Sequence, residues 1–528
     1  MRVIDSSSVC KTRFRRAHAV PSMRLPRVFV YDARDVAAVA FGDDKSAWSK
    51  YQLLLANGDV ASQLGIPRRV KEPMYAEGLV HRHFLASPRM VRTNNASEAD
   101  MLWVPLWPYA ACTALRTCRQ LVGKDKWACR INVAHLHQIV DTCDAMRKVY
   151  TWLERQDTWK RSHGADHIFF LTMKDMLWSQ SSNRTTSTRI LSNAVFATTE
   201  DRLPYPELRH GCNTAIMPYY ANRSVWDDGL RFRQLVERKR DLLAFIGNSA
   251  GFSCHLLQGS WPIPVRRARS HKFGGPMCEN HHANKVRQAI LRAVVLSGGT
   301  ARSLLRNSTR GQSDVPRALR AAIFCPHAPG DVYTSPRLYT AIMALCIPII
   351  VSDRVQLPFT DAVNWSSFTL RVPERNLTRR GGDEDLVQLA RSVPPSRVTA
   401  MQRALWQARR LLTFHEEGPA RDGRDALGLL TDELWRGVRC RRPVLVEQLG
   451  EAPCVHGYTF GSSQRYALWV RGGCHGKFIS STCLSRRGHA RRCPALECGG
   501  SSSRGPTLEA DGLARETSLG VTPCAGWQ

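Results

Sequence analysis

The chain has 528 residues, of which 43% are hydrophobic and 23% charged, and its formal net charge is +30. This composition supplies ample apolar material for a core and excludes a disordered, collagen-like or small disulfide-stapled chain. The length predicts about three domains. A balance this basic is typical of proteins that bind nucleic acid, an anionic surface or an acidic substrate, so the charge needs an explanation.

Most of the basic residues are arginine, which accounts for 62 of the 75 Lys and Arg residues. They are scattered along the chain, in pairs such as Arg68–Arg69, Arg266–Arg267 and Arg379–Arg380. Codon bias alone produces an excess of this kind. The sequence has no pattern of an RNA-recognition module, a zinc finger or a basic zipper. We therefore expect no nucleic-acid partner.

Residues 1–26 form a basic segment without an apolar run. A signal peptide needs an apolar stretch of about 7–15 residues, and a membrane anchor needs about 20. We therefore expect a basic N-terminal tail, with no signal or anchor segment in the sequence as given.

Cysteines and glycosylation motifs indicate the compartment. The chain has 17 cysteines, many for a cytosolic protein, and their spacing does not match paired zinc ligands. Disulfides formed in a secretory lumen are the better interpretation. Asn-x-Ser/Thr motifs, which are acceptors for N-glycosylation, favour the same compartment. They begin at Asn95, Asn183, Asn222, Asn307, Asn364 and Asn376.

Short apolar runs alternate with segments of helical spacing in the first half of the chain. Buried strands are predicted at Arg27–Tyr31, Asp100–Leu106 and His167–Leu171. Helices are predicted within Tyr75–Leu85 and Ile131–Arg147. This alternation predicts an α/β domain with a parallel sheet over residues 27–230.

The same alternation returns over residues 231–436. Strands are predicted at Leu242–Ile246, Ala321–Cys325 and Cys346–Val351, and helices at Val286–Leu296 and Arg397–Leu412. A further helix is expected after Ser335, because serine is a favourable N-cap and Pro336 suits the first helical position. Beyond it, we expect a small β-rich domain over 437–485 and a disordered tail over 486–528.

The segment Gly330–Arg337 is the strongest candidate site. In an open α/β sheet, ligands bind outside the carboxyl ends of the strands, and a helix that begins there offers free backbone N–H groups. Gly330 allows the backbone close to a ligand, and the planar guanidinium of Arg337 can pair with a phosphate. A diphosphate fits this pattern. The alternative is an ordinary capped helix with a solvated arginine.

A longer pattern surrounds this segment. Residues Phe324–Glu374 contain, in order, FCPHAPGD, SPRLYTAI, CIPIIVSD, LPF and WSSF. Upstream stand a loose Tyr75-x-Glu77 block, then Ala99-Asp100 with Val104-Pro105, then Asp166-His167, then Phe245-x-Gly247-Asn248. These blocks resemble those of the exostosin-like glycosyltransferases, glycosyltransferase family 47, in content and order over about residues 27–415.

The resemblance implies a GT-B architecture, with an acceptor-side domain over 27–230 facing a nucleotide-sugar domain over 231–436. It implies transfer from a nucleotide-sugar donor, expected to be a UDP-sugar, to a glycan or polysaccharide acceptor, with inversion at the anomeric carbon. It implies a Golgi lumen location, no metal and no other cofactor. It also allows a complex with another glycosyltransferase.

Donor-binding residues carry over position by position. Ser335 and Arg337 match the start of the family's donor-binding helix, where Arg337 would neutralise the leaving nucleoside diphosphate. Gly330 would shape the phosphate loop. Asp353 would lie near the cleft, and a turn or cap role is its alternative.

An inverting transfer also needs a base that takes the proton of the acceptor hydroxyl. Glu77, Asp331 and His167 are the candidates. For each of them, the alternative is a buried polar residue whose hydrogen bonds are satisfied within the protein.

Two positions depart from the family pattern. Thr340 stands where the family has Glu or Asp, whose carboxylate would accept hydrogen bonds from the donor's ribose, and losing a charged hydrogen bond weakens binding by about 1.5–3 kcal/mol. The alternative function that follows is a non-catalytic, glycan-binding or partner-stabilising subunit. Leu345 stands where many relatives have Gly.

The segment Val444–Phe478 resembles a small domain family of unknown function, with Cys454 and Cys474 as an expected pair. A carbohydrate-binding role and a stabilising β-cap are the two interpretations of this segment.

Overall fold

The computed structural model describes residues 25–42, 80, 84–106, 145–170, 193–199, 214–219, 232–237, 241–247, 282–298, 300–303, 318–329, 333–414, 420–439, 443–452, 454, 460–462, 468–470, 473–480, 496–499 and 522–523. The helices predicted within Tyr75–Leu85 and Ile131–Arg147 lie mostly outside these residues. Within them, no helix combines the length and the apolar character that a membrane crossing requires.

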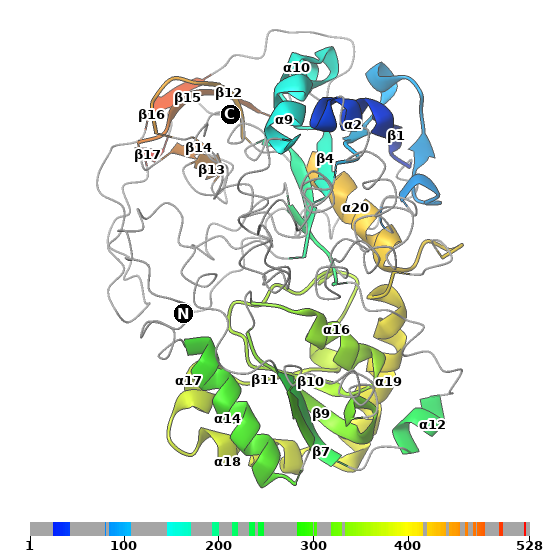
Figure 1. Cartoon of the computed structure of the whole chain (residues 1–528), viewed down its shortest axis with the longest axis vertical. Helices are drawn as coiled ribbons and strands as arrows, with labels where there is room; N and C mark the ends of the chain where they lie inside the picture. The colour runs from blue at the N-terminus through cyan, green and yellow to red at the C-terminus, as the bar shows by residue number, and fades with distance from the viewer. Residues whose placement is uncertain are drawn as a thin grey trace, which may run out of the picture. The chain divides into compact units, whose positions relative to one another are not determined.

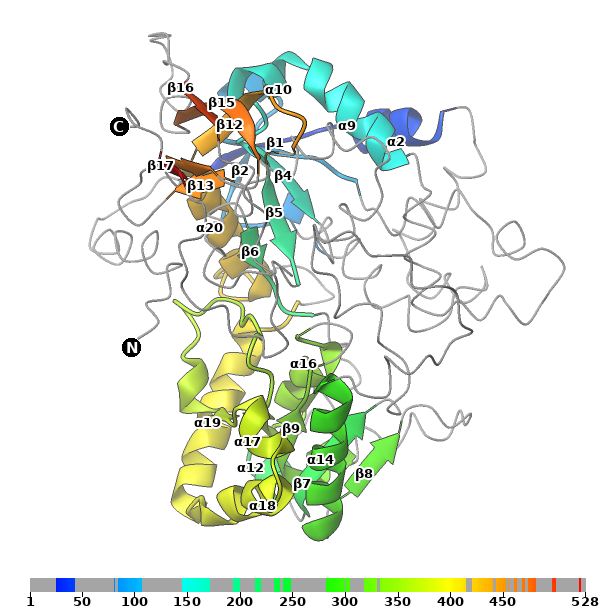
Figure 2. The same cartoon turned by 90° about the vertical axis from the view of Figure 1, so that its left-hand side faces the viewer.

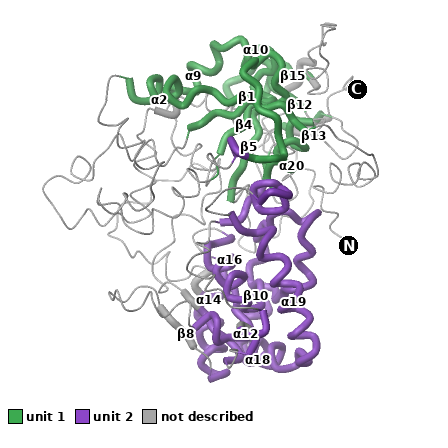
Figure 3. The backbone as a smooth tube through the Cα atoms, turned by 90° about the vertical axis from the view of Figure 1, so that its right-hand side faces the viewer, with its two compact units in different colours: residues 1–81, 87–215, 430–528 green, residues 82–86, 216–429 purple. Residues whose placement is uncertain are grey.

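The chain divides into two compact units, which Figure 3 shows in different colours. Unit 1 consists of residues 1–81, 87–215 and 430–528, and unit 2 of residues 82–86 and 216–429. Each unit contains a parallel sheet. The expected α/β class with parallel sheets is therefore confirmed.

Unit 1 is built on a sheet with the strand order β2-β1-β3-β4-β5-β6. The strands are β1 (Arg27–Val30), β2 (Val91–Arg92), β3 (Met101–Trp103), β4 (His167–Phe170), β5 (Val195–Thr198) and β6 (Thr214–Ile216). β1 pairs in parallel with β2 and β3, and β4 pairs in parallel with β3 and β5. Every side chain of β3, β4 and β5 is buried, which explains their continuous apolar runs.

Helices accompany this sheet at α2 (Ala33–Phe41), α9 (Ala145–Arg155) and α10 (Asp157–Ser162). Helix α2 begins where Asp32, in an extended conformation, accepts a hydrogen bond from the backbone N–H of Arg34. This satisfies one of the free amides of the first turn. α2 packs against α9, and Val36 and Leu153 are fully or almost fully buried.

Unit 2 is built on a sheet with the order β11-β10-β9-β7-β8. The strands are β7 (Asp241–Gly247), β8 (Thr300–Ser303), β9 (Ala322–His327), β10 (Ile347–Ile350) and β11 (Leu370–Arg371), and all neighbours are parallel. The predicted strands at Leu242–Ile246, Ala321–Cys325 and Cys346–Val351 are confirmed as β7, β9 and β10.

Helices flank the sheet of unit 2 on both sides (Figures 1 and 2). They are α12 (Phe232–Glu237), α14 (His282–Leu296), α16 (Pro336–Met343), α17 (Glu374–Thr378), α18 (Gly382–Ser392) and α19 (Pro395–Leu411). α14 packs on β7 and α18, whereas α19 packs on β10 and α16. The core between the layers includes Phe245, Ile290, Phe324 and Ile349, each at most 2% exposed.

Helix α20 (Ala426–Arg439) precedes the strands at the end of the chain. These are β12 (Pro443–Gln448), β13 (Phe460–Ser462), β14 (Leu468–Val470), β15 (His475–Ser480), β16 (Leu496–Gly499) and β17 (Thr522–Pro523). They form two three-stranded sheets, β12-β15-β16 and β13-β14-β17. The expectation of a tail without structure after residue 485 does not hold for β16 and β17, because ladder pairing with β15 and β14 orders them.

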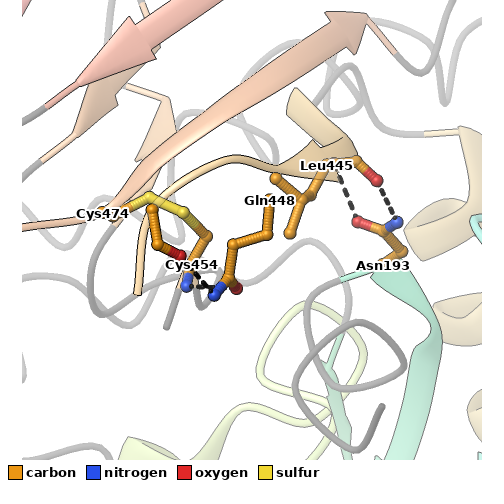
Figure 4. The surroundings of a disulfide bond; sticks show 6 residues. Asn193, Leu445, Gln448, Cys454 and Cys474 are labelled. Atoms are coloured by element: carbon orange, nitrogen blue, oxygen red, sulfur yellow. Dashed lines mark hydrogen bonds between the residues drawn. A yellow bond between two sulfur atoms is a disulfide. The ribbon is translucent and has the colours of Figure 1, made fainter. Parts of the chain in front are cut away.

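A small core joins these terminal strands. It contains Leu445, Phe460, Phe478 and the disulfide Cys454–Cys474, which confirms the expected pairing. The backbone N–H of Cys454 donates to the side-chain oxygen of Gln448 at 3.1 Å, so the disulfide is also held from strand β12 (Figure 4).

Asn193, just before β5, connects the first sheet of unit 1 to strand β12. Its Oδ1 accepts a hydrogen bond from the backbone N–H of Leu445 at 3.0 Å, and its Nδ2 donates to the Leu445 carbonyl at 2.8 Å (Figure 4). Nδ2 also donates to the carbonyl of His163 at 2.9 Å. Asn193 is 2% exposed, so its buried carboxamide pairs with the N–H and the carbonyl of Leu445 as a neighbouring strand would.

We expect Asn193→Ala to destabilise unit 1 by about 1–3 kcal/mol, because it leaves the N–H and the carbonyl of Leu445 buried without partners. Chemical denaturation measures the loss. Asn376→Ala, at an exposed position of α17 in unit 2, is the matched control and should change little. Equal unfolding free energies for Asn193→Ala and the wild type would contradict the prediction.

Candidate functional site

The candidate site lies where β9 ends and α16 begins, at the carboxyl edge of the parallel sheet of unit 2. β9 and β10 are parallel neighbours, so the chain must cross back between them, and α16 forms part of this crossover. The disulfide Cys325–Cys346 joins β9 to the residue before β10 with a Cα–Cα distance of 5.7 Å. The crossover is therefore a covalently closed loop, a pairing that the sequence patterns did not single out.

Ser335 is the N-cap of α16, as predicted, but its side chain makes no capping hydrogen bond. The residue is 8% exposed, and its hydroxyl oxygen is buried without a hydrogen-bond partner. A serine N-cap normally accepts from an amide of the first turn. Here the Ser335 side chain accepts from no amide, although the N–H of Leu338 donates to the Ser335 carbonyl at 3.1 Å and Pro336 has no N–H. The positive end of the helix dipole suits this helix start to an anion.

Arg337 is half-buried in the first turn of α16. Thr340, one turn later, donates its hydroxyl to the carbonyls of Pro336 and Arg337, both at 3.0 Å. The Thr340 hydroxyl hydrogen is therefore used within its own helix, and only oxygen lone pairs could accept from a ligand. That Thr340 contacts a donor less strongly than a carboxylate would stays a prediction.

Arg287 of α14 is a site residue that the sequence analysis missed. It is 3% exposed, and its Nε donates to the carbonyl of Pro329, two residues after β9, at 3.0 Å. A buried guanidinium requires partners, because removing a charge from water is unfavourable. A signal was present in the sequence: one charged residue on the apolar face that Ile290 and Val294 define in this helix.

His327, the last residue of β9, lies close to both arginines. It is 3% exposed, and neither ring nitrogen makes a hydrogen bond. Burial, the charge of Arg337 and the charge of Arg287 together lower the pKa of His327 to about 3, and the Tyr333 backbone carbonyl opposes this decrease only in part. The imidazole is therefore neutral at physiological pH.

Asp353 and Glu374 hold one another at the ends of β10 and β11. The Asp353 N–H donates to Glu374 Oε1 at 2.8 Å, and the Glu374 N–H donates to Asp353 Oδ1 at 3.1 Å. This reciprocal pair ties Asp353 to the first residue of α17, and a role of Asp353 in donor binding stays a prediction. Burial lowers the pKa of Arg371, and the exposed carboxylate of Asp353 opposes this decrease.

Three predicted site residues, Gly330, Asp331 and Glu77, lie outside the described residues. Leu345, in the tight turn between α16 and β10, has a φ of 53°. This is the left-handed region, which disfavours side chains with a Cβ. Glycine adopts this conformation without strain.

His167 lies in unit 1 with no exposed surface, and both of its ring nitrogens are engaged. Nδ1 contacts Asp166 Oδ1 at 2.9 Å, and Nε2 contacts the Tyr31 hydroxyl at 2.8 Å. The Tyr31 hydroxyl also contacts Thr158 Oγ1 at 2.6 Å, and burial raises the pKa of Tyr31 to about 12. This buried chain favours an orienting role for His167 over proton abstraction from an acceptor.

Asp166, at one end of this series of hydrogen bonds, is ionised. Burial raises its pKa, but hydrogen bonds from His167 and Ser162 and the charge of Arg161 outweigh burial, so the pKa lies below its ordinary value. The Arg161 guanidinium is 2.9 Å from Asp166 Oδ2.

We expect the hydrogen-bonded series Asp166–His167–Tyr31 to be structural. Tyr31→Phe removes the tyrosine hydroxyl and leaves His167 Nε2 buried without a partner. We expect a loss of about 1–3 kcal/mol of unfolding free energy and no change in nucleotide affinity. Thermal unfolding and calorimetric titration with UDP measure the two effects. Unchanged stability combined with a large loss of turnover would instead assign His167 to the chemistry.

Among the described residues, no group of three or more His, Cys, Asp or Glu could hold a metal ion. A cavity of about 370 Å³ is lined by residues from 362–368, from α19 and from 422–424, and no candidate site residue lines it. Its wall includes Arg410, whose guanidinium already pairs with Asp422 at 2.8 Å.

Comparison with known families gives the class of the protein. The exostosin GT47 domain matches residues 22–382, which include β1, β9, α16 and the whole crossover between β9 and β10. The chain belongs to this glycosyltransferase family. A second match, to a protein family of unknown function (DUF3011), covers residues 433–516 and therefore strands β12 to β16.

Several of the chain's curated relatives are named as probable plant glycosyltransferases. The chain is 25% identical over 304 residues to a probable arabinosyltransferase of Arabidopsis thaliana, covering 56% of the chain and 54% of the relative. It is 24% and 27% identical to two probable glucuronoxylan glucuronosyltransferases of the same plant, covering 68% and 69% of the chain and 66% and 72% of the relatives. The match thus spans between about half and three quarters of these proteins.

Proposed function

We propose that the protein is a glycosyltransferase that moves a sugar from a nucleotide-sugar donor, a UDP-sugar, to a glycan or polysaccharide acceptor. The relatives' names support a catalytic role over that of a non-catalytic subunit. The observation that carries the proposal is the start of α16 at the carboxyl edge of a parallel sheet. There the Ser335 side chain caps no amide, Arg337 stands in the first turn, and Arg287 donates to the Pro329 carbonyl just after β9.

The donor's diphosphate would bind at this helix start. Arg337 and Arg287 would supply two positive charges, the positive end of the helix dipole would add to them, and the unpartnered Ser335 hydroxyl could donate a hydrogen bond. Gly330 would complete the phosphate loop, Thr340 would meet the ribose, and Asp353 would act from the end of β10 chiefly by holding Glu374 in place.

Catalysis would rest on charge that develops on the departing nucleoside diphosphate. When the bond from the anomeric carbon to the diphosphate oxygen breaks, that oxygen gains negative charge, and a guanidinium already in place stabilises it. Such preorganised stabilisation makes a metal unnecessary, in line with an inverting transfer without metal or other cofactor.

A base must take the proton of the acceptor hydroxyl in an inverting transfer. Glu77 and Asp331 remain our proposed candidates for this role. His167 is the weakest of the three, because its ring nitrogens are committed to Asp166 and Tyr31.

The remaining parts of the proposal concern organisation and place. We propose a GT-B arrangement of an acceptor-side domain (27–230) and a donor domain (231–436), with a small β-rich domain (437–485) as a stabilising or glycan-binding addition. Golgi lumen residence accords with the disulfides Cys325–Cys346 and Cys454–Cys474. It also accords with the exposure of Asn95, Asn364 and Asn376, the glycosylation motifs within the described residues. A partner glycosyltransferase would fit the same setting.

Donor selection tests the proposal. Calorimetric titration of the full chain with UDP, GDP and CMP should show binding of UDP. Incubation with UDP-xylose, UDP-arabinose and UDP-glucuronic acid, with release of UDP as the signal, should then identify one donor that is hydrolysed or transferred fastest. No binding of any nucleotide by the folded chain would refute the proposal.

A further inference from the structure

The end of β9 holds a polar side chain that the proposed function has not yet used. His327 is nine-tenths and more buried, and both of its ring nitrogens are without a hydrogen bond. A buried polar atom left unpaired costs about 1–3 kcal/mol, so such atoms in a native protein call for an explanation. The Ser335 hydroxyl, similarly buried and unpartnered, is at the same edge of the sheet.

The His327 imidazole lies at the end of β9, next to the segment that leads to the proposed diphosphate site. His327 ends the strand from which the crossover to α16 departs, and Arg287 bonds the carbonyl of Pro329, two residues further on. The charged groups that act on the ring are Arg337 from α16 and Arg287 from α14. Both are cations, and within the part of the chain that the structure describes no carboxylate acts on the ring.

One backbone carbonyl favours a protonated nitrogen on the His327 ring. The backbone carbonyl of Tyr333, which already accepts a hydrogen bond from the Ser352 hydroxyl at 2.7 Å, favours the imidazolium form. A neutral imidazole can donate from only one nitrogen, whereas an imidazolium donates from both. With an anion at the helix start, an imidazolium could satisfy both nitrogens, one on the carbonyl and one on the anion.

We propose that His327 is a proton-coupled anchor of the donor: neutral in the free protein, it takes one proton from solvent when a nucleoside diphosphate binds between it, Arg337 and Arg287. This inference rests on the proposed function and adds a residue and a proton to it. The diphosphate's negative charge offsets the two guanidinium charges that keep the ring neutral, and it accepts a charge-assisted hydrogen bond from the imidazolium.

Protonation of His327 makes nucleotide binding depend on pH. The pKa of His327 is about 3 in the free protein and is raised in the complex. A group with a higher pKa in the bound state strengthens binding as the pH falls toward that bound-state pKa. Proton uptake also places a third positive charge next to the departing diphosphate, where negative charge grows during transfer.

The test compares UDP affinity in the full chain with and without the imidazole. Dissociation constants are measured for the wild type and His327→Gln between about pH 8 and about pH 6. The ratio of the variant's constant to that of the wild type cancels the titration of UDP itself. We expect this ratio to rise roughly tenfold over the range, and His475→Gln, in unit 1, should keep a ratio near one throughout.

Three other outcomes decide the matter differently. A ratio that does not change with pH, with tight UDP binding in both proteins, overturns the role of His327 and leaves the proposed function intact. No UDP binding by the wild type overturns both. If His327→Gln does not fold, calorimetry of the wild type in two buffers of different ionisation heat replaces it: proton uptake on UDP binding supports the inference, and zero uptake or release refutes it.

Discussion

Arg337→Ala should abolish most of the nucleotide binding and nearly all of the turnover of this protein. Arg337 stands in the first turn of α16, where the Ser335 side chain makes no capping hydrogen bond. Removing a charged hydrogen-bond partner costs about 1.5–3 kcal/mol, which is roughly a 10–150-fold loss of UDP affinity. Turnover should fall further, because under the proposed function the same guanidinium would stabilise the charge that develops on the leaving group.

Two variants sharpen this experiment. Arg403→Ala removes an exposed arginine of α19 in the same unit and should leave UDP affinity unchanged. Arg337→Lys keeps the positive charge but loses the planar fork, so an intermediate loss is expected. Calorimetry with UDP and a UDP-release assay measure both quantities. If folded Arg337→Ala bound UDP as tightly as the wild type, the diphosphate would have to bind elsewhere.

The second large effect is expected for the double change Cys325→Ala with Cys346→Ala. The disulfide closes a segment of 21 residues that contains His327, Ser335 and Arg337. Cross-linking a loop of this size stabilises a fold by about 3 kcal/mol through the entropy of the unfolded chain. For a unit of this size, that corresponds to a decrease of roughly 6–12 °C in Tm. UDP affinity should fall as well, because the start of α16 loses its covalent link to β9.

The chain supplies a matched control for this change. The disulfide Cys454–Cys474 closes a segment of 20 residues, so its loop entropy is nearly the same, but it lies in unit 1. Cys454→Ala with Cys474→Ala should therefore lower stability by a similar amount and leave UDP affinity unchanged. Equal affinity losses in both double variants would show that the effect on binding is global instability.

Features set by residues close together in the sequence could be predicted, whereas features set by contacts between distant segments could not. β7, β9 and β10 could be predicted, because buried parallel strands are continuous apolar runs. The start of α16 could also be predicted from Ser335 and Pro336. In contrast, β8 and β11 are short segments without a marked apolar pattern, and pairing with β7 and β10 is what makes them strands.

The site shows the same division. Arg337 could be proposed from the sequence, because a local motif at a helix start suggests its role, and that role stays a prediction. Arg287 and His327 were not, because their roles depend on neighbours about forty residues away or on another element. Even Ser335 was only half predicted: its place at the helix start was right, whereas the free hydroxyl is a property of its surroundings.

By itself, the sequence determined the class of this protein: apolar periodicity set two parallel α/β sheets, and the ordered motifs from Phe324 to Glu374 identified the family. Only the tertiary structure decided which cysteine pairs with Cys325, that Asp353 caps Glu374, and that Asn193 holds strand β12. The physical reason is that period and capping act within one segment, whereas these contacts join residues brought together only when the segments pack.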